Sequence, residues 1–250
     1  METPDDSSGG KRALWAVCFL AFPCVKMIPL TVNNKTKAHM KTSEAMKLIG
    51  GLSEPMKMPC FSYSIPAIYC KTGMKLRKVK DSVCSKCYAM KFRYLFGNVK
   101  NAMQRRFDSL KKSNWTKAMT IAIGAKEKSG FFRWHDSGDI QSLRHLEKIA
   151  AVANALPSIV FWLPTREYSI AVAYYEKHKA WPPNLVVRLS ALTINGNPPT
   201  AIAKRIGCVT SGVSNSKQAF DCPSSKQGGK CLDCRACWNK QIENINYKLH

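Results

Sequence analysis

The sequence predicts an α/β protein with a parallel sheet like part of a (β/α) barrel, followed by a small cysteine-rich module that binds metal. Three observations support this fold class. Apolar segments typical of buried strands recur about every 25 residues from residue 131 onward. Helical segments with an apolar face separate them, as expected for right-handed parallel crossovers. After residue 212 this periodicity ends, and cysteines and glycines dominate.

These patterns divide the 250-residue chain into an N-terminal extension (1–40), an α/β core with a first cysteine group (41–212) and a cysteine-rich C-terminal module (213–250). The apolar fraction of 45% is typical of a globular protein, and the length suffices to bury a core. The module lacks an apolar pattern of its own, so we expect metal ligation to hold it together.

The first part of the core is predicted to be mostly helical. Residues 42–50 form a short helix, and 60–67 alternate between apolar and polar residues, as a strand does. Helical patterns follow at 83–96 and 101–112, and Asn114 is suited to cap a third helix.

The second part of the core alternates strands and helices. We predict strands at 131–135, 159–165, 184–191 and 206–212, separated by helices at 141–156, 168–178 and 200–206. The first of these helices has an apolar face and ends before Pro157.

Polar side chains follow each predicted strand, at the edge where parallel strands place their functional sites. The sequence RWHDSGD offers His135, Asp136 and Asp139 as candidate catalytic acid–base residues, with Ser137 and Gly138 as candidate cofactor-binding residues. Arg166 and Arg188 end the next two strands and are suited to a carboxylate or phosphate of a cofactor.

The chain contains 11 cysteines, several at two-residue gaps that favour metal ligation over disulfides and therefore a reducing compartment. The first group is Cys70, Cys84 and Cys87. Three thiolates on a [4Fe–4S] cluster would leave one iron open to a substrate or cofactor, whereas Cys60 as a fourth ligand would close the site. Alternatively, Cys60 and Cys70 are ordinary buried residues.

The second group is Cys222, Cys231, Cys234 and Cys237, in the spacing C-x8-C-x2-C-x2-C. Zinc modules usually have two C-x2-C pairs about a dozen residues apart, whereas dense cysteine runs are typical of iron–sulfur proteins. Zinc also accepts four thiolates, so both metals remain candidates.

The charge indicates a polyanionic partner. The formal net charge is +23, and residues 70–112 contain 13 basic and two acidic residues. We therefore expect a nucleic acid or nucleotide as partner. A smaller reason for the basic residues is the negative charge of a thiolate-bound cluster.

The apolar segment 13–22 follows Lys11 and Arg12, as in a signal peptide, but is too short to span a bilayer. It fits a signal or anchor, an element packed on the core, or an extension upstream of a start at Met27. We expect no stable membrane insertion; the oligomeric state is left open.

Several motifs in order resemble the phage "gene product 88" domain family: CSKCYA, RWHDSGDI, WLPTRE, RLSA, CPSSKQGGKCLDCRACW and a terminal YKLH. The resemblance runs from about Cys60 to His250. It implies a protein encoded by a virus or prophage, located in the cytoplasm of the infected or lysogenic host cell, with residues 1–26 outside the domain.

The chain is more distantly similar to radical S-adenosylmethionine enzymes, which are partial (β/α) barrels with three cysteines on a [4Fe–4S] cluster. Cys84–Ala89 resembles the end of their cluster motif, although thirteen residues separate Cys70 from Cys84 where that family has three. The resemblance implies S-adenosylmethionine as cofactor and up to two [4Fe–4S] clusters, and the positive charge indicates a nucleotide or nucleic-acid substrate. The alternatives are a non-catalytic nucleic-acid-binding protein with structural zinc sites, and a secreted protein with disulfides.

Overall fold

The computed structural model describes residues 40–216, 218 and 220–249. The apolar segment 13–22 and nearly all of the predicted extension 1–40 lie outside the described residues. Residues 39–250 form one compact unit. No helix in the described part of the chain is long and apolar enough to cross a membrane.

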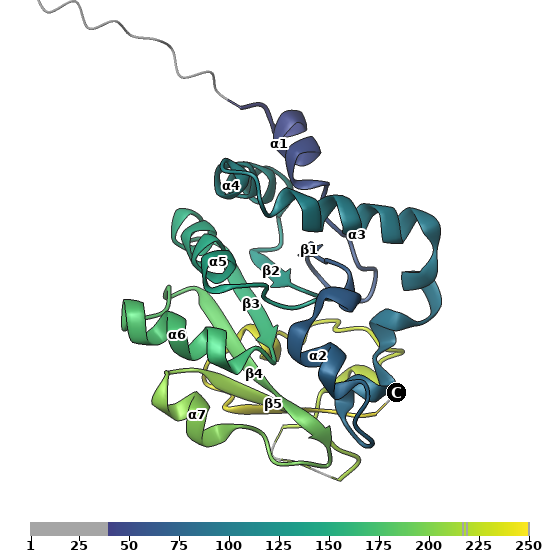
Figure 1. Cartoon of the computed structure of the whole chain (residues 1–250). Helices are drawn as coiled ribbons and strands as arrows, with labels where there is room; N and C mark the ends of the chain where they lie inside the picture. Colours follow the sequence, from purple (N-terminus) through teal and green to yellow (C-terminus); the bar gives the residue numbers. More distant parts are fainter. Residues whose placement is uncertain (1–39, 217, 219, 250) are drawn as a thin grey trace, which may run out of the picture. The chain divides into compact units, whose positions relative to one another are not determined.

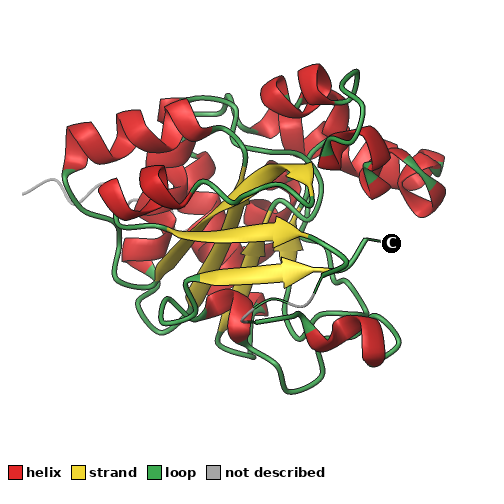
Figure 2. Ribbon diagram, turned by 90° about the horizontal axis from the view of Figure 1, so that it is seen from below, coloured by secondary structure: helices red, strands yellow, loops and turns green. Residues whose placement is uncertain are grey.

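The described chain contains one sheet of six parallel strands in the order β1-β2-β3-β4-β5-β6 (Figures 1 and 2). The strands are β1 (Ser62–Tyr63), β2 (Phe131–Trp134), β3 (Val160–Thr165), β4 (Leu185–Ile194), β5 (Val209–Val213) and β6 (Asn244–Tyr247). The sheet is open, with β1 and β6 at its edges, so the α/β class and the parallel sheet are confirmed. Because all strands run the same way, their carboxyl ends meet at one edge.

Seven α-helices within the described residues connect and cover this sheet (Figure 1). They are α1 (Thr42–Ile49), α2 (Lys71–Leu76), α3 (Gly97–Ser109), α4 (Trp115–Lys126), α5 (Leu143–Ala155), α6 (Tyr168–His178) and α7 (Thr200–Arg205). Apart from α2, each of these helices overlaps a helix that the sequence predicts. Helix α5 begins where the Ser142 hydroxyl accepts a hydrogen bond from the His145 amide.

Alternation along the strands separates two apolar layers. On β2, Phe132 and Trp134 belong to the large core that the α-helices cover, together with Phe161 and Leu163 of β3. Neighbouring residues on the same strands face the opposite side of the sheet, because successive side chains of a strand alternate. That second face carries Arg133 and, on the following strands, the aromatic and apolar residues of a smaller core.

The C-terminal segment covers the second face and builds this smaller core. Trp238 packs against Trp162 and Phe131 at ring-centroid distances of 5.4 and 5.5 Å, and its Nε1 donates to the Phe132 carbonyl. The segment then returns to the sheet as β6, which the sequence did not predict. The predicted module therefore lies within the same compact unit and has an apolar core.

Arg188 of β4 holds this segment in place. Its guanidinium is fully buried and donates five hydrogen bonds to carbonyls of Thr210, Ala236, Cys237, Asn239 and Ile242, at 2.7–3.1 Å. These bonds replace the hydrogen bonds to water that the guanidinium and the carbonyls of an irregular segment would otherwise make.

Residues 83–96 do not form the predicted α-helix. Three short 3-10 turns occupy this stretch, namely η2 (Val83–Lys86), η3 (Tyr88–Met90) and η4 (Phe92–Leu95). Ser82 caps the first turn through Ser85 N, and the Ile194 amide of β4 donates to the Asp81 carbonyl. The stretch is thus folded onto the end of β4, and these tertiary bonds override its helical pattern.

Arg188→Met should lower the free energy of unfolding by roughly 3–5 kcal/mol, because it leaves five carbonyls without their charged donor. Urea unfolding followed by tryptophan fluorescence measures this change. The exposed Arg205 provides the matched control, since Arg205→Met should change stability by less than about 0.5 kcal/mol. Equal effects of the two substitutions would contradict the anchoring role of Arg188.

Candidate functional site at the carboxyl edge of the sheet

The first cysteine group lies in the connection between β1 and β2, at the carboxyl edge of the sheet. Cys70 precedes α2, Cys84 lies in η2, and Cys87 follows it directly. An isolated bridge between Ser82 and Thr193 places η2 beside the end of β4. The long gap between Cys70 and Cys84 is therefore occupied by α2 and a loop that returns to the sheet.

Gly73 shows how closely the first two thiols approach. A methyl group on its α-carbon would lie 3.6 Å from Cys84 Sγ, 3.8 Å from Cys70 Sγ and 2.9 Å from Cys70 Cβ. Both sulfur atoms thus border the same glycine, although thirteen residues separate the two cysteines in the sequence. A side chain at position 73 would fill the space between them.

The electrostatics of the thiols reflect this clustering. Burial, followed by the nearby Asp139, Cys87 and Cys84, raises the pKa of the Cys70 thiol. Burial also raises the pKa of Cys84, although the guanidinium of Arg166 opposes the shift. Protonated thiols are therefore favoured, and a bound metal ion would supply the charge that makes them thiolates.

One carboxylate fixes the loop to the end of β3, and a second connects the segment after β2 to the end of β3. Glu167, after β3, accepts hydrogen bonds from the amide and hydroxyl of Thr72 at 2.8 and 2.9 Å, within two residues of Cys70. Asp139 accepts from the Thr165 hydroxyl at 2.6 Å and the Arg166 amide at 2.9 Å. Burial raises the pKa of Asp139 to about 6. Both carboxylates position backbone around the thiols.

Asp136 connects the segment after Cys87 to β1 and β2. Its carboxylate accepts from the Ser62 hydroxyl at 2.8 Å and the Tyr94 hydroxyl at 3.1 Å, and its carbonyl accepts from the Tyr88 hydroxyl. The predicted catalytic pair Asp136 and Asp139 therefore lies at the expected edge. Each carboxylate already accepts hydrogen bonds that hold the protein's own segments.

Ser137 and Gly138, expected to bind a cofactor, pack against Ile65 beyond β1. The Ser137 hydroxyl donates to the Ile65 carbonyl at 3.0 Å, and the Ile65 amide donates to the Ser137 carbonyl at 3.0 Å. Gly138 has φ +87°, and a methyl group there would lie 2.2 Å from Ile65 Cγ1. Glycine is required here for close packing.

His135 occupies a different environment from the one the sequence suggested. Its ring lies 5.3 Å from the ring of His145 on α5, and neither ring nitrogen of His135 has a hydrogen-bond partner among the described residues. Burial lowers the pKa of His135 to about 3, so the imidazole is neutral at physiological pH. The positive φ of 55° turns this side chain toward the helix-covered core.

The two arginines also separate. Arg166 remains at the edge, where its Nε donates to the Ala191 carbonyl at 3.1 Å and its Nη atoms make no hydrogen bond in the described chain. Arg188, by contrast, uses all five donors on carbonyls, so no donor remains for the expected cofactor. Its side chain faces the C-terminal segment.

Sequence reasoning missed several residues that shape the site: Thr72, Gly73, Tyr88, Glu167 and Tyr168. The Tyr168 hydroxyl donates to the Ser190 carbonyl, and the charges of Cys84 and Arg166 both affect the pKa of Tyr168. The only available signals were the position of Glu167 after a strand and of Tyr88 beside Cys87.

The second cysteine group is assembled on the other face of the sheet. Cys222, Cys234 and Cys237 belong to or contact the smaller apolar core, and Cys231 is close enough to Cys222 and Cys234 for their charges to raise its pKa. Cys60 lies in this core as well, so the structure places it with the C-terminal group and not with Cys70.

All nine cysteines within the described residues are free thiols. Among these residues, no three His, Cys, Asp or Glu side chains converge as the ligands of one metal ion do.

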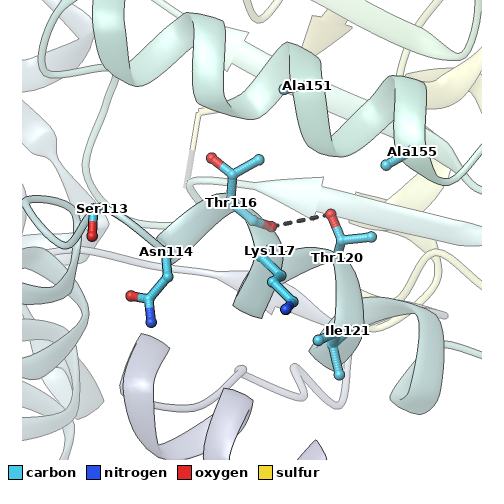
Figure 3. A pocket seen from close by; sticks show the side chains of 8 residues that line it. All are labelled: Ser113, Asn114, Thr116, Lys117, Thr120, Ile121, Ala151 and Ala155. Atoms are coloured by element: carbon cyan, nitrogen blue, oxygen red, sulfur yellow. Dashed lines mark hydrogen bonds between the residues drawn. The ribbon is translucent and has the colours of Figure 1, made fainter. Parts of the chain in front are cut away.

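A cavity of about 530 Å³ lies elsewhere, on the outer surface of α4 and α5 (Figure 3). It is lined by Ser113, Asn114, Thr116, Lys117, Thr120, Ile121, Ala151 and Ala155. None of the predicted site residues lines it, and the lining contains a single ionisable side chain. This cavity therefore offers no catalytic constellation.

Comparisons with known proteins identify one relationship. A family model described as "Gene product 88" matches residues 29–240. This match spans most of the chain and includes both cysteine groups. No curated protein and no solved structure matches the chain.

The buried His135–His145 pair predicts acid sensitivity. Burial lowers the pKa of both imidazoles in the folded protein, that of His135 to about 3, whereas unfolded histidine titrates near 6.5. The unfolded state therefore binds more protons below pH 6.5. The free energy of unfolding should fall with decreasing pH, by up to about 1.4 kcal/mol per pH unit for each histidine.

Urea unfolding between pH 7 and 4 measures this dependence. His135→Asn, whose side chain tolerates the positive φ, should reduce the slope, whereas His178→Asn at an exposed site should not reduce it in the same way. An unchanged slope in His135→Asn would show that His135 is not buried in its neutral form.

Proposed function

This chain belongs to the gene product 88 family, and we propose that it is an iron–sulfur enzyme similar to the radical S-adenosylmethionine type. One observation carries the proposal: three thiols from a single loop after the first strand lie at the carboxyl edge of an open parallel sheet. In parallel sheets this edge is where cofactors and substrates bind.

The residues present fit an iron–sulfur cluster at this edge. Cys70 Sγ and Cys84 Sγ flank the space above Gly73, and Cys87 is near enough to influence the pKa of Cys70. Three thiolates suit a [4Fe–4S] cluster with one iron lacking a protein ligand. Cys60 cannot be counted as the fourth ligand, because it packs with the C-terminal group.

Cys70, Cys84 and Cys87 would hold such a cluster, which would supply one-electron reduction of S-adenosylmethionine with the electron taken from an external reductant. The chain's own residues have positioning roles. Glu167 holds the backbone next to Cys70, and Asp139 holds the strand ends. Arg166, with its Nη donors directed to no described residue, is suited to a carboxylate of the cofactor or a phosphate of the substrate.

We further propose that Cys222, Cys231, Cys234 and Cys237 hold a second, supporting cluster beneath the sheet. A metal–thiolate site there would bind the long irregular segment that covers the second face. Two oxygen-sensitive clusters require a reducing compartment, which supports the cytoplasm of the infected or lysogenic host cell as the location.

The surface beside the first site supports a nucleotide or nucleic-acid substrate. Between residues 71 and 105, ten lysines and arginines are exposed, and Asp81 is the single exposed acidic residue. Phe92 and Phe96 are 79% and 58% exposed in the same stretch. Basic side chains interleaved with exposed aromatic rings are typical of surfaces that bind single strands through phosphate contacts and base stacking.

The second candidate function is a non-catalytic nucleic-acid-binding protein with structural zinc sites. The same basic and aromatic surface favours it, since that surface requires no chemistry at the cysteines. Zinc accepts four thiolates as readily as a cluster does. The two candidates therefore differ in the metal and in the response to S-adenosylmethionine.

Anaerobic purification of the full chain should yield a brown protein with about eight irons and broad absorption near 400 nm, as two cubane clusters require. Adding S-adenosylmethionine should alter the EPR signal of the dithionite-reduced protein. A colourless protein with two zinc ions would refute the enzyme proposal and favour the binding protein. Iron without any response to S-adenosylmethionine would refute the radical reaction.

A substitution at Gly73 tests whether the response to S-adenosylmethionine arises at the first site. Gly73→Ala introduces a methyl group 2.9 Å from Cys70 Cβ and should reduce the response to S-adenosylmethionine by roughly ten-fold or more. Gly97→Ala is the matched control, because its methyl group would contact nothing within 4 Å. A full response in Gly73→Ala would place the reactive cluster elsewhere.

The nucleic-acid surface has its own test. Phe92→Ala/Phe96→Ala should weaken binding of a fluorescent single-stranded oligonucleotide at least ten-fold, since each stacked base contributes about 1–3 kcal/mol. Fluorescence anisotropy at several salt concentrations measures the affinity. Met56→Ala removes an equally exposed apolar side chain outside this surface and should leave binding unchanged. Equal affinities for all three proteins would exclude this surface.

A further inference from the structure

The face of the sheet covered by the C-terminal segment contains a fifth thiol from the other end of the described chain. Cys60, which precedes β1, is 5% exposed and belongs to one apolar cluster with Cys237, Trp162 and Trp238. Cys222 and Cys234 contact the same cluster. A buried cysteine is usually only a small apolar residue, but here the apolar cluster also contains or borders three further thiols.

Backbone hydrogen bonds fix the two segments side by side. The Cys231 amide donates to the carbonyl of Lys57, three residues before Cys60, at 2.9 Å. The Cys222 amide donates to the Asn246 carbonyl of β6 at 2.8 Å. Burial raises the pKa of Cys60 to about 12, and the neighbouring Cys231 contributes to the shift. Cys60 therefore shares one apolar cluster with cysteines of the C-terminal group.

A partly buried arginine with a buried Nε provides an independent observation. Arg133 of β2 stacks over Trp162 at 4.4 Å, and its Nε is buried without a hydrogen-bond partner among the described residues. Its Nη atoms contact only Met58 Sδ and the Tyr88 hydroxyl, and it makes no salt bridge in the described chain. Removing a cation from water costs free energy unless an anion lies nearby, and Arg133 has no carboxylate partner in the described chain.

The thiols are the neighbours that could provide this negative charge. Arg133 stacks over Trp162, which belongs to the same apolar cluster as Cys60 and Cys237. Asp136, whose charge raises the pKa of Arg133, already accepts hydrogen bonds from Ser62 and Tyr94. Thiolates bound to a metal would carry the anionic charge that Arg133 lacks.

We infer that Cys60 is a ligand of a metal–thiolate site shared with the C-terminal cysteines, and that Arg133 is its counter-charge. This site links the entry of β1 to the segment that closes the second face. The inference rests on the proposal that the C-terminal cysteines bind a metal. It does not depend on metal binding at Cys70, Cys84 and Cys87. A [4Fe–4S] cluster or a zinc ion takes four thiolates, so one of the four C-terminal cysteines is then not a ligand.

The test uses the full chain with Cys70, Cys84 and Cys87 replaced by alanine, so that only the second site can bind metal. Iron, sulfide and zinc are measured after anaerobic purification, and affinity is measured by competition with a chelator. Adding Cys60→Ser should weaken metal binding by more than about ten-fold, because loss of an outer-shell partner alone costs 10–100-fold. Cys208→Ser is the matched control, since Cys208 lies in the helix-covered core, and should retain the metal.

Thiol alkylation of the wild-type protein provides a second measurement that requires no substitution. Cys60 should resist iodoacetamide in the metal-loaded protein and react together with the C-terminal cysteines after chelation, whereas Cys208 should react equally in both states. Peptide mass spectrometry identifies each site. The Cys60 result should hold with either metal.

Two results would overturn the inference. One is equal metal retention in the Cys60→Ser and Cys208→Ser proteins. The other is a triple-alanine background that binds no metal. Failure of the first site, by contrast, would appear only in the wild-type response to S-adenosylmethionine and would leave this result intact.

Discussion

The buried guanidinium of Arg188 is the interaction on which the second face of the sheet depends. Five carbonyls from β5 and the C-terminal segment accept its hydrogen bonds, and three of them belong to Ala236, Cys237 and Asn239. This irregular segment cannot satisfy its own carbonyls through helix or strand bonds. Without Arg188 the segment would lose its contact with β4, and the smaller apolar core around Trp238 would open to water.

Two cysteine groups thus lie on different sides of one sheet architecture. The first lies at the carboxyl edge, in a loop that Glu167 and Asp136 connect to the strand ends. The second lies under the sheet, where Cys60 joins the C-terminal thiols. Tyr88 follows Cys87 and contacts Arg133, which is itself close to the second group. The Tyr88–Arg133 hydrogen bond therefore connects the segment after Cys87 with Trp162 of the smaller core, over which Arg133 stacks.

The sequence was most informative where packing follows a simple period. Strands β2 to β5 and helices α4 to α6 lie close to their predicted positions, because apolar alternation and helical spacing directly encode which face is buried. Prediction failed at residues 83–96, where Tyr88 and Tyr94 bond to Asp136 and short 3-10 turns replace the helix, and at β6, which is short and pairs with a strand more than thirty residues earlier. In both places the structure depends on residues far away in the sequence, so no local sequence pattern predicts it.

The sequence by itself determined the parallel α/β architecture, the family and the two groups of closely spaced cysteines, because each is encoded by local spacing. Only the tertiary structure decided which polar residues face the carboxyl edge. It turned His135 into the helix-covered core and Arg188 toward the C-terminal segment, and it left Arg166 at the edge. It also placed Cys60 beside cysteines more than 160 residues away. These outcomes depend on long-range hydrogen bonds and packing, which no single segment of the chain specifies.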